Sequence, residues 1–173
     1  FLRNPISQEM GRKFKMSFSS TDDDSALAFI HDLGFIPKIK DGARGFKVML
    51  GGGLGSQPRH ADTLHEFLPV NELIPLIEGV LRVFDRHGER ARRLKARMKF
   101  LIKDLGVEGF MNLVAEEQKA LSYKTFEIDT TEFEHAIAAP LAEAPQIIIE
   151  DTKAFEAWKA TNVFKQKQNG LVA

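Results

Sequence analysis

The chain has 173 residues, of which 43% are hydrophobic, and its 24 Lys and Arg residues balance its 24 Asp and Glu residues. This length suits one domain with a tail, and the zero net charge excludes a global field that would attract nucleic acid or an acidic membrane. Cysteine is absent, which excludes disulfides, thiolate zinc sites, cysteine-ligated iron–sulfur clusters and cysteine nucleophiles within this chain.

The first residues, Phe1 to Pro5, lack a signal-peptide pattern and are typical of the middle of a polypeptide, so we expect a piece of a longer protein. Residues 1–11 are typical of a connector. No apolar run reaches the roughly 18 residues that a membrane span needs. We expect a cytoplasmic protein without membrane contact.

Residues 13–18 alternate between apolar and polar side chains, which predicts a half-buried strand. The apolar members would pack inward: Phe14, Met16 and Phe18. Lys13 and Lys15 would share the outer face, with Arg12 just before them. Two ammonium groups aimed from one strand are what a small oxyanion or a polycarboxylate needs. The pattern alone favours solvated lysines, because exposed Lys is the norm.

The residues after this strand predict a helix. Residues 19–25 offer N-cap hydroxyls and then acids, so the helix should run through residues 26–30 and end at Gly34. His31, in its last turn, could ligate a metal or relay a proton. Packing, or interaction with the helix dipole, explains a lone His in this position more often.

Two further strands are predicted over residues 35–40 and 45–50, with a turn at Asp41-Gly42. The second strand continues into the glycine-rich loop 51–55. Such a loop is either a flexible turn or a place where backbone N–H groups approach an anion closely. It lacks the Gly-Lys-Ser/Thr end of a Walker A motif and the spacing of a dinucleotide fingerprint.

Helices are predicted for most of the following section. Residues 57–65 predict loop and a short helix, and Asn71 is expected to cap a helix that ends at Gly88. Two more helices are predicted over residues 91–105 and 107–121.

The predicted helix 91–105 has one basic face, while its other face, including Leu94, should pack inward. The cations are Arg90, Arg92, Arg93, Lys95, Arg97, Lys99 and Lys103. The favoured interpretation is a solvated face, followed by packing against another part of a larger chain or docking of an acidic electron donor. Nucleic-acid binding is disfavoured, because aromatic residues do not interleave with the cations and the chain is neutral.

Periodicity weakens between residues 122 and 150, which predicts an interdomain linker on the surface with a short strand at 146–150. A short helix is predicted at 151–161 and a strand at 163–168. Asn169-Gly170 then predicts a hairpin.

Several separated motifs resemble, in order, those of the sirohaem-containing nitrite and sulfite reductases. The motifs are Arg-Lys-Phe-Lys (12–15), Ile-His-Asp-Leu-Gly-Phe-Ile (30–36), Gly-Phe-Lys-Val-Met-Leu-Gly-Gly-Gly-Leu-Gly (45–55), Arg-Val-Phe-Asp-Arg-His-Gly-Glu-Arg (82–90) and Lys-Ala-Arg-Met-Lys-Phe (95–100). The resemblance covers about residues 1–115 and resumes at 158–168. The sequence departs from the family at Met10-Gly11, where members usually have Leu-Pro.

The resemblance implies an α+β fold, a mixed sheet packed with helices, over residues 1–121. Residues 122–150 would be a linker, and residues 151–173 would begin a second ferredoxin-like half domain. Family members carry two copies of this α+β domain, and one copy ligates a [4Fe–4S] cluster through cysteines. This chain resembles the other, cysteine-free copy, so we expect it to ligate neither the cluster nor the sirohaem iron.

The resemblance also implies site residues. Lys13 and Lys15 match the family's paired active-site lysines, and Arg12 would contact the sirohaem carboxylates. The glycines expected to line the carboxylate rim of the tetrapyrrole are Gly51, Gly52 and Gly53. No metal ligand is expected.

The implied function is part of an assimilatory reductase that converts nitrite to ammonia or sulfite to sulfide with sirohaem and a [4Fe–4S] cluster. The implied partners are the remaining domains of the same polypeptide, the small anion, and an electron donor such as ferredoxin or a flavoprotein. The fragment alone is expected to be inactive. The alternative is a non-catalytic structural or interaction module of the same fold.

Overall fold

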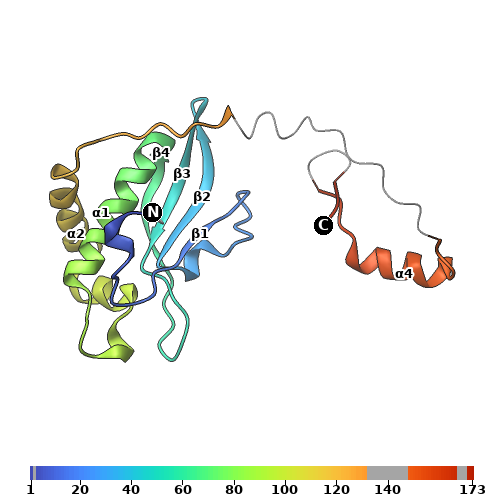
Figure 1. Ribbon diagram of the computed structural model, residues 1–173, viewed down its shortest axis with the longest axis horizontal. Coiled ribbons are helices and arrows are strands. Elements are labelled where there is room, and N and C mark those ends of the chain that lie inside the picture. Colours follow the sequence, from blue (N-terminus) through green and yellow to red (C-terminus); the bar gives the residue numbers. More distant parts are fainter. Residues whose placement is uncertain (2, 132–147, 167–170) are drawn as a thin grey trace. The chain divides into compact units, whose positions relative to one another are not determined.

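The computed structural model describes residues 1, 3–131, 148–166 and 171–173. These residues divide into two units, Phe1–Asp129 and Thr130–Ala173. The first unit combines a four-stranded sheet with two long helices (Figure 1), which confirms the predicted α+β fold.

The sheet is mixed. Its strands are β1 (Met16–Phe18), β2 (Leu33–Lys40), β3 (Ala43–Leu50) and β4 (Asp62–Pro69), in that spatial order. β1 runs parallel to β2, whereas β2 with β3 and β3 with β4 are antiparallel. The predicted turn lies between β2 and β3. Asp41 and Gly42 have φ values of 50° and 79°, the positive values that a two-residue hairpin turn favours.

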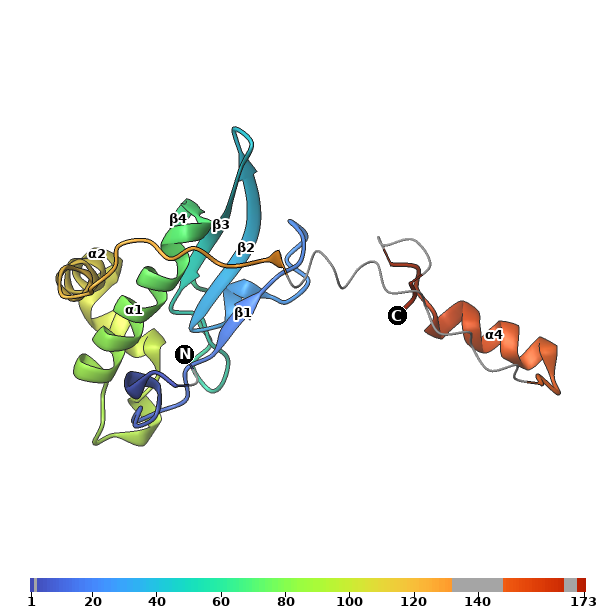
Figure 2. The ribbon, with the colours of Figure 1, turned by 45° about the horizontal axis from the view of Figure 1, so that its top comes forward.

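The two long helices, α1 (Leu73–His87) and α2 (Met98–Lys119), cover one face of the sheet (Figure 2). A 3-10 turn, η3 (Val70–Glu72), leads into α1, which ends at Gly88 as predicted. Gly106, at φ 70°, interrupts α2 where the sequence places a boundary between two helices.

The hydrophobic core lies between the helices and the sheet. Its largest fully buried apolar side chains are Leu33, Phe35, Val48, Leu50, Val80, Val83, Met98, Ile102, Phe110 and Val114. They come from both central strands and both helices, and each contributes about 1.5–3 kcal/mol by leaving water. Phe14, which lies shortly before β1, packs against this core.

The predicted helix through residues 26–30 is wrong. Only one 3-10 turn forms there, η2 (Ala28–Ile30). Asp24 and Leu27 both have left-handed φ, at 51° and 53°, which ends any helical run. The Asp24 side chain instead accepts the N–H of Ala28 at 2.8 Å, a local bond that competes with helix formation.

The predicted loop and short helix at 57–65 are also wrong in part, because β4 begins at Asp62. The strand pairs with the free edge of β3 and buries Leu68 opposite Phe46. Its side-chain pattern contains His65 and Glu66, so the strand depends on this tertiary pairing more than on local alternation.

The second long helix starts at Met98, seven residues later than residue 91, where the sequence predicts its start. Glu89 accepts the N–H groups of Ala91 (2.8 Å) and Arg92 (3.0 Å), and a 3-10 turn, η4 (Arg93–Lys95), follows. Leu94, expected to face inward, is 89% exposed.

Residues that follow α2 remain in the first unit. Phe126 N–H donates to Asn71 O at 2.8 Å, and the Tyr123 hydroxyl donates to Glu78 on α1. The first unit therefore extends beyond residue 121, to Asp129.

In the second unit, helix α4 (Thr152–Asn162) confirms the predicted helix and begins with Asp151 accepting the N–H of Ala154 at 3.0 Å. Phe164 and Ala173 exchange two backbone hydrogen bonds of 2.8 and 2.9 Å, as in an antiparallel pair. The predicted turn at Asn169-Gly170 and part of the predicted strand at 146–150 lie outside the described residues.

Candidate anion and cofactor site

Lys13 and Lys15 are exposed and directly precede β1. Both polar groups of the Lys15 main chain are hydrogen-bonded to the segment at the start of β2. Its N–H donates to Asp32 Oδ2 at 3.0 Å, and its carbonyl accepts the N–H of Leu33 at 3.2 Å. The Lys15 side chain therefore extends from a backbone position that is fixed by hydrogen bonds through both its N–H and its carbonyl group.

Of the three apolar residues expected to pack inward, only Phe14 is partly buried against the hydrophobic core, so the prediction is wrong for Met16 and Phe18. Phe14 packs on Phe84 with ring centroids 5.7 Å apart, and Phe18 stacks on Phe35 at 4.5 Å. Met16 and Phe18 nevertheless remain 38% and 49% exposed. They lie at the edge of the sheet, where fewer neighbours cover them.

Part of the opposite face of β1 is covered by other residues of the chain. Ser17, predicted to face outward, is buried and donates through Oγ to Ala26 O at 2.8 Å. A Cβ at Gly34 on the adjacent strand would lie 2.3 Å from Ala28 O. The segment before β2 thus covers this face, and Lys13 and Lys15 lie just before the covered part.

Asp32 has no exposed surface and joins separate segments of the chain. Arg97 Nη2 lies 3.0 Å from Asp32 Oδ1 and 2.8 Å from Asp32 Oδ2, and Lys15 N–H is the second donor. Burial raises the pKa of the Asp32 carboxyl, and the Arg97 guanidinium and the Lys15 N–H oppose the rise. Three hydrogen bonds accepted by one carboxyl group fit the ionised form.

The glycine loop packs against the same segment. Its N–H groups donate to main-chain carbonyls: Gly51 to Asp32 (2.9 Å), Gly52 to His31 (2.9 Å) and Gly53 to Arg59 (2.9 Å). A Cβ at Gly52 would lie 2.6 Å from Phe29 O. Glycine is required here by the packing of the chain on itself, and these three amides already have acceptors.

Two cations fasten this loop from outside. Arg59 Nη1 donates to Gly51 O at 3.0 Å, and Lys99 Nζ donates to the carbonyls of Leu54 (3.0 Å) and Gln57 (2.5 Å). Lys99 is only 5% exposed, and burial, together with a neighbouring arginine, lowers the pKa of its ammonium group.

Arg12 and Lys13 line an open hollow of about 640 Å³ beside the 3-10 turn η1 (Pro5–Ser7). Its other lining residues are Phe1, Ser7, Gln8, Met10, Phe14, Met16 and Leu81. Mainly apolar walls with a few cations are typical of cofactor sites. Among the described residues, Lys15 and the three glycines do not line this hollow, so the predicted site residues do not share one cavity.

Two arginines have a buried Nε without a hydrogen-bond partner among the described residues, Arg12 and Arg97. A buried N–H that lacks an acceptor is costly. A carboxylate would supply that acceptor, and guanidinium groups suit carboxylates well. These two side chains therefore fit an anionic cofactor such as sirohaem, which has peripheral carboxylates.

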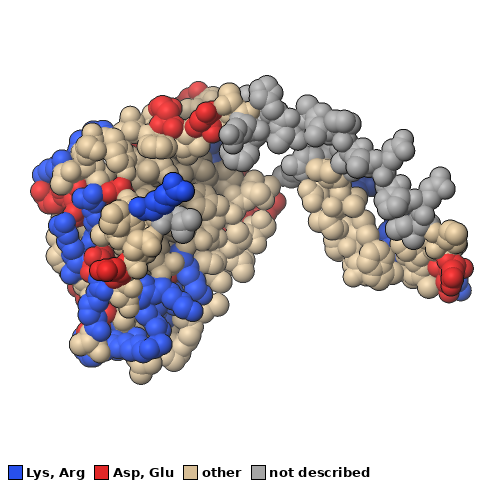
Figure 3. All heavy atoms as spheres, in the orientation of Figure 1, with Lys and Arg blue, Asp and Glu red and all other residues tan. Residues whose placement is uncertain are grey.

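The predicted basic face is only partly solvated. Figure 3 shows Lys and Arg side chains gathered over the connection between α1 and α2. Arg90 pairs with Asp85, and Arg92 pairs with Glu89 at 2.5 Å.

Arg97 and Lys99, which the sequence assigns to this solvated face, instead point into the protein. Sequence reasoning missed both of them, and it missed Asp32. The available signal was an acidic residue placed directly before the apolar strand β2, which suggests a buried charge that needs a partner.

Within the described residues, no group of three or more His, Cys, Asp and Glu side chains is placed to hold a metal ion. None of the described helices combines the length and apolar character that crossing a membrane requires.

The family model described as the nitrite and sulphite reductase 4Fe-4S domain matches residues 1–121. The chain is 34% identical over 117 residues to sulfite reductase [ferredoxin] 1 of Mycolicibacterium paratuberculosis, covering 67% of this chain and 21% of that protein. It is 32% identical over 163 residues to the ferredoxin–nitrite reductase of Synechococcus elongatus, covering 92% of this chain and 27% of that protein.

A solved structure, that of the NirA protein of Mycobacterium tuberculosis, matches with a TM-score of 0.60 and 30% identity. The match covers 72% of this chain and 22% of that chain, so the present chain spans about a fifth to a quarter of the length of its relatives. With the family model covering residues 1–121, the chain belongs to the nitrite and sulfite reductase 4Fe-4S domain family.

Proposed function

We propose that this chain is the cysteine-free α+β copy within a sirohaem-dependent nitrite or sulfite reductase, and that Lys13 and Lys15 supply positive charge to its anion pocket. The observation that carries the proposal is the pair of exposed lysines on a segment whose backbone is held at Lys15 by Asp32 and Leu33. Relatives named as sulfite and nitrite reductases support the choice of reaction.

In this role, the two ammonium groups lower the cost of bringing a small anion into a pocket with little water. They also donate hydrogen bonds, and protons, to oxygen atoms that leave as the N–O or S–O bonds break. Sirohaem, when bound, supplies the electron chemistry. Residues of this chain charge the pocket and orient the anion.

Arg12 is proposed to contact a sirohaem carboxylate, because its buried Nε has no acceptor among the described residues and its side chain lines the hollow beside η1. Gly51, Gly52 and Gly53 are proposed to contact the cofactor in a more limited way than the sequence suggests. Their N–H groups have acceptors within the chain, so contact with the cofactor rim would be through their Cα atoms.

The proposed electron donor is a small acidic protein such as ferredoxin. The support is that relatives from Arabidopsis thaliana and Synechococcus elongatus are named as ferredoxin–nitrite reductases. A flavoprotein is the other candidate, since a relative from Chromohalobacter salexigens is named as the haemoprotein component of an NADPH sulfite reductase.

The test is to replace Lys13 and Lys15 singly with alanine in the complete reductase that contains this chain. Each change should lower turnover by about 10²-fold, the usual cost of losing a proton donor or a charged hydrogen bond at the reacting centre. Sirohaem absorption should remain. Lys40→Ala is the matched control, because Lys40 is an exposed lysine at the far end of β2.

Unchanged turnover in both variants, with sirohaem retained, would reject this role. It would favour the alternative, a non-catalytic module that keeps the fold for structural contacts.

A further inference from the structure

We infer that Asp32 is a positioning residue for the anion pocket: its buried carboxylate holds the backbone of Lys15 and the guanidinium of Arg97 in one fixed arrangement. The inference rests on the proposed function of Lys15. Asp32 itself would touch neither substrate nor cofactor.

The Asp32 carboxylate acts as a clamp, because it accepts three hydrogen bonds from two donor groups, Lys15 N–H and Arg97 Nη2. Oδ2 accepts both Lys15 N–H (3.0 Å) and Arg97 Nη2 (2.8 Å), and Oδ1 accepts Arg97 Nη2 as well (3.0 Å). The donors come from the segment before β1 and from the residue that precedes α2, which lie far apart in sequence. One side chain therefore sets the relative placement of two cationic residues.

The main chain beside Asp32 extends the same clamp. Lys15 O accepts the N–H of Leu33 (3.2 Å), and Asp32 O accepts the N–H of Gly51 (2.9 Å). Both backbone polar atoms of Lys15 are thus bound by Asp32 and its neighbour. A side chain that leaves such a backbone is aimed more accurately than one on a free loop, and catalysis is sensitive to that accuracy.

Charge gives the clamp a second role. Lys15 and Arg97 both interact electrostatically with Asp32, and Arg97 and Asp32 shift the pKa of Lys99 in opposite directions. The carboxylate is the negative charge among these three cations. Without it, Arg97 would lose its described ion-pair partner, and its buried Nε already lacks an acceptor. Arg97 would then move, or capture an anion that belongs in the pocket.

Asp32→Asn tests this arrangement in the complete reductase, because the amide keeps an acceptor for Lys15 N–H and removes the charge that binds Arg97. We expect kcat/KM for nitrite or sulfite to fall at least tenfold at a temperature where the variant is folded and carries its sirohaem. The matched control is Glu78→Gln, which neutralises another buried, arginine-paired carboxylate on α1. That control should leave kcat/KM within twofold of the wild type.

Two further variants separate positioning from stability. On a Lys15→Ala background, Asp32→Ala should lower kcat/KM by less than it does on the wild-type background, because one of the two groups through which Asp32 acts is gone. Asp32→Glu should recover part of the loss. Equal kinetic loss in Asp32→Asn and Glu78→Gln, or full additivity of Asp32→Ala with Lys15→Ala, would overturn the inference.

A readout without turnover distinguishes this inference from the proposed function. In the chain itself, hydrogen exchange at the Lys15 amide should be slow in the wild type and in Asp32→Asn, and at least tenfold faster in Asp32→Ala. Fast exchange in the wild type would overturn the clamp whatever the reaction is. If exchange behaves as expected but Lys15→Ala leaves turnover unchanged, the clamp stands and the proposed function fails.

Discussion

Among the described residues, three buried carboxylates are bound by an arginine, and two of them, Asp32 and Glu78, have surroundings with opposite effects on the pKa. Asp32 is fully buried, and its pKa is raised because desolvation outweighs Arg97 and the Lys15 N–H. Glu78 is 5% exposed, and desolvation also acts to raise its pKa. Hydrogen bonds from Tyr123 and Arg82 outweigh that effect, so the pKa of Glu78 is lowered.

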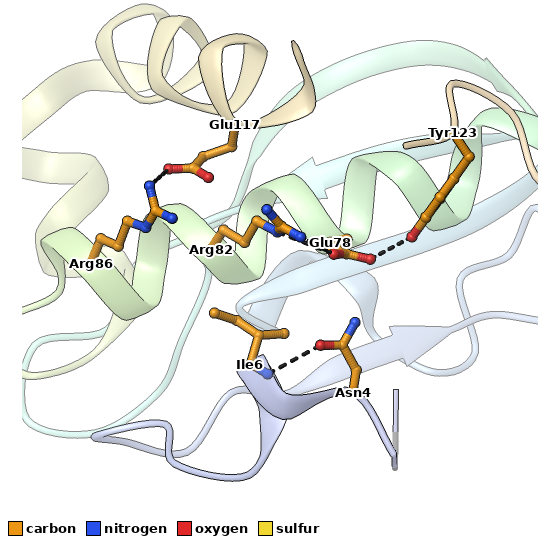
Figure 4. A network of polar contacts seen from close by, with 7 residues as sticks. All are labelled: Asn4, Ile6, Glu78, Arg82, Arg86, Glu117 and Tyr123. Atoms are coloured by element: carbon orange, nitrogen blue, oxygen red, sulfur yellow. Dashed lines mark hydrogen bonds and ion pairs between the residues drawn. The ribbon is translucent and has the colours of Figure 1, made fainter. Parts of the chain in front are cut away.

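The partners of Glu78 explain the difference. Arg82, one turn along α1, contacts Glu78 Oε1 through Nε (3.1 Å) and Nη2 (2.6 Å), and the Tyr123 hydroxyl donates to Oε2 (Figure 4). This network fastens the segment that follows α2 onto α1. Arg86 Nη1 donates to Glu117 Oε1 at 2.5 Å, and this ion pair joins α1 to α2.

Asp32 and Glu78 show that burial and an arginine partner do not by themselves define the role of a carboxylate. The Glu78 network joins neighbouring structural elements and favours the ionised acid, as a stabilising network should. The Asp32 cluster costs desolvation free energy and joins segments that carry the candidate cations. A charge that is kept at such a cost fits a role in positioning better than a role in stability.

The largest expected effect on stability comes from Asp32→Ala. Removing one member of a buried ion pair leaves the other charge uncompensated, which destabilises by about 3–5 kcal/mol. Urea unfolding of the 173-residue chain, followed by circular dichroism, measures the change. A loss below about 1 kcal/mol would mean that Arg97 finds another partner easily.

Glu78→Gln should have a smaller effect. The expected loss is about 1–3 kcal/mol, the value of hydrogen bonds to a charged group. It stays below that of Asp32→Ala, because the Arg82 side chain is 27% exposed and can be hydrated. The same urea experiment checks this order, and a larger loss for Glu78→Gln than for Asp32→Ala would contradict it.

Tyr123→Phe should change how stability depends on pH. Burial, and then the hydrogen bond to the Glu78 carboxylate, raise the pKa of Tyr123 to about 12. Because the unfolded value is about 10, the phenol stabilises the fold fully below about pH 10, and this contribution is lost as the pH rises to about 12.

The urea midpoint of unfolding should therefore fall more steeply between about pH 10 and pH 12 for the wild type than for Tyr123→Phe. Urea unfolding at several pH values in this range measures the difference. If the urea midpoints of the two proteins fell in parallel with pH, the Tyr123 hydroxyl would not titrate as described.

Glu116→Gln should have the smallest effect. Glu116 and Lys119 form an exposed ion pair at 2.6 Å, with side chains 68% and 70% exposed. Solvent screens such a pair, so the free energy of unfolding should change by less than about 0.5 kcal/mol. This variant measures how much an exposed ion pair contributes to stability, for comparison with the buried pairs of Asp32 and Glu78. If Glu116→Gln lowered the free energy of unfolding as much as Glu78→Gln does, burial would not distinguish these pairs.

Local patterns in the sequence predict much of this fold. Alternating residues and the Asp41-Gly42 turn predict β2 and β3, and apolar periodicity up to Gly88 predicts α1. Residues 26–30 have an apolar pattern typical of a helix, but Asp24 binds the backbone of Ala28 and prevents the helix.

The candidate site was less predictable. The positions of Lys13 and Lys15 follow from alternation and from the family motif. The Asp32–Arg97 pair does not, because its members are 65 residues apart and meet only once β2 and α2 have packed together. A run of cations around Lys99 looks solvated in sequence, and only the packed structure shows which of them point inward.

The most direct test of the central proposal is a visible absorption spectrum of the complete protein that contains this chain, with assays for iron and acid-labile sulfide. We expect sirohaem bands together with about one [4Fe–4S] cluster per polypeptide, the cluster being ligated by cysteines outside this chain. A colourless protein without iron would contradict the reductase assignment and favour a structural module of the same fold.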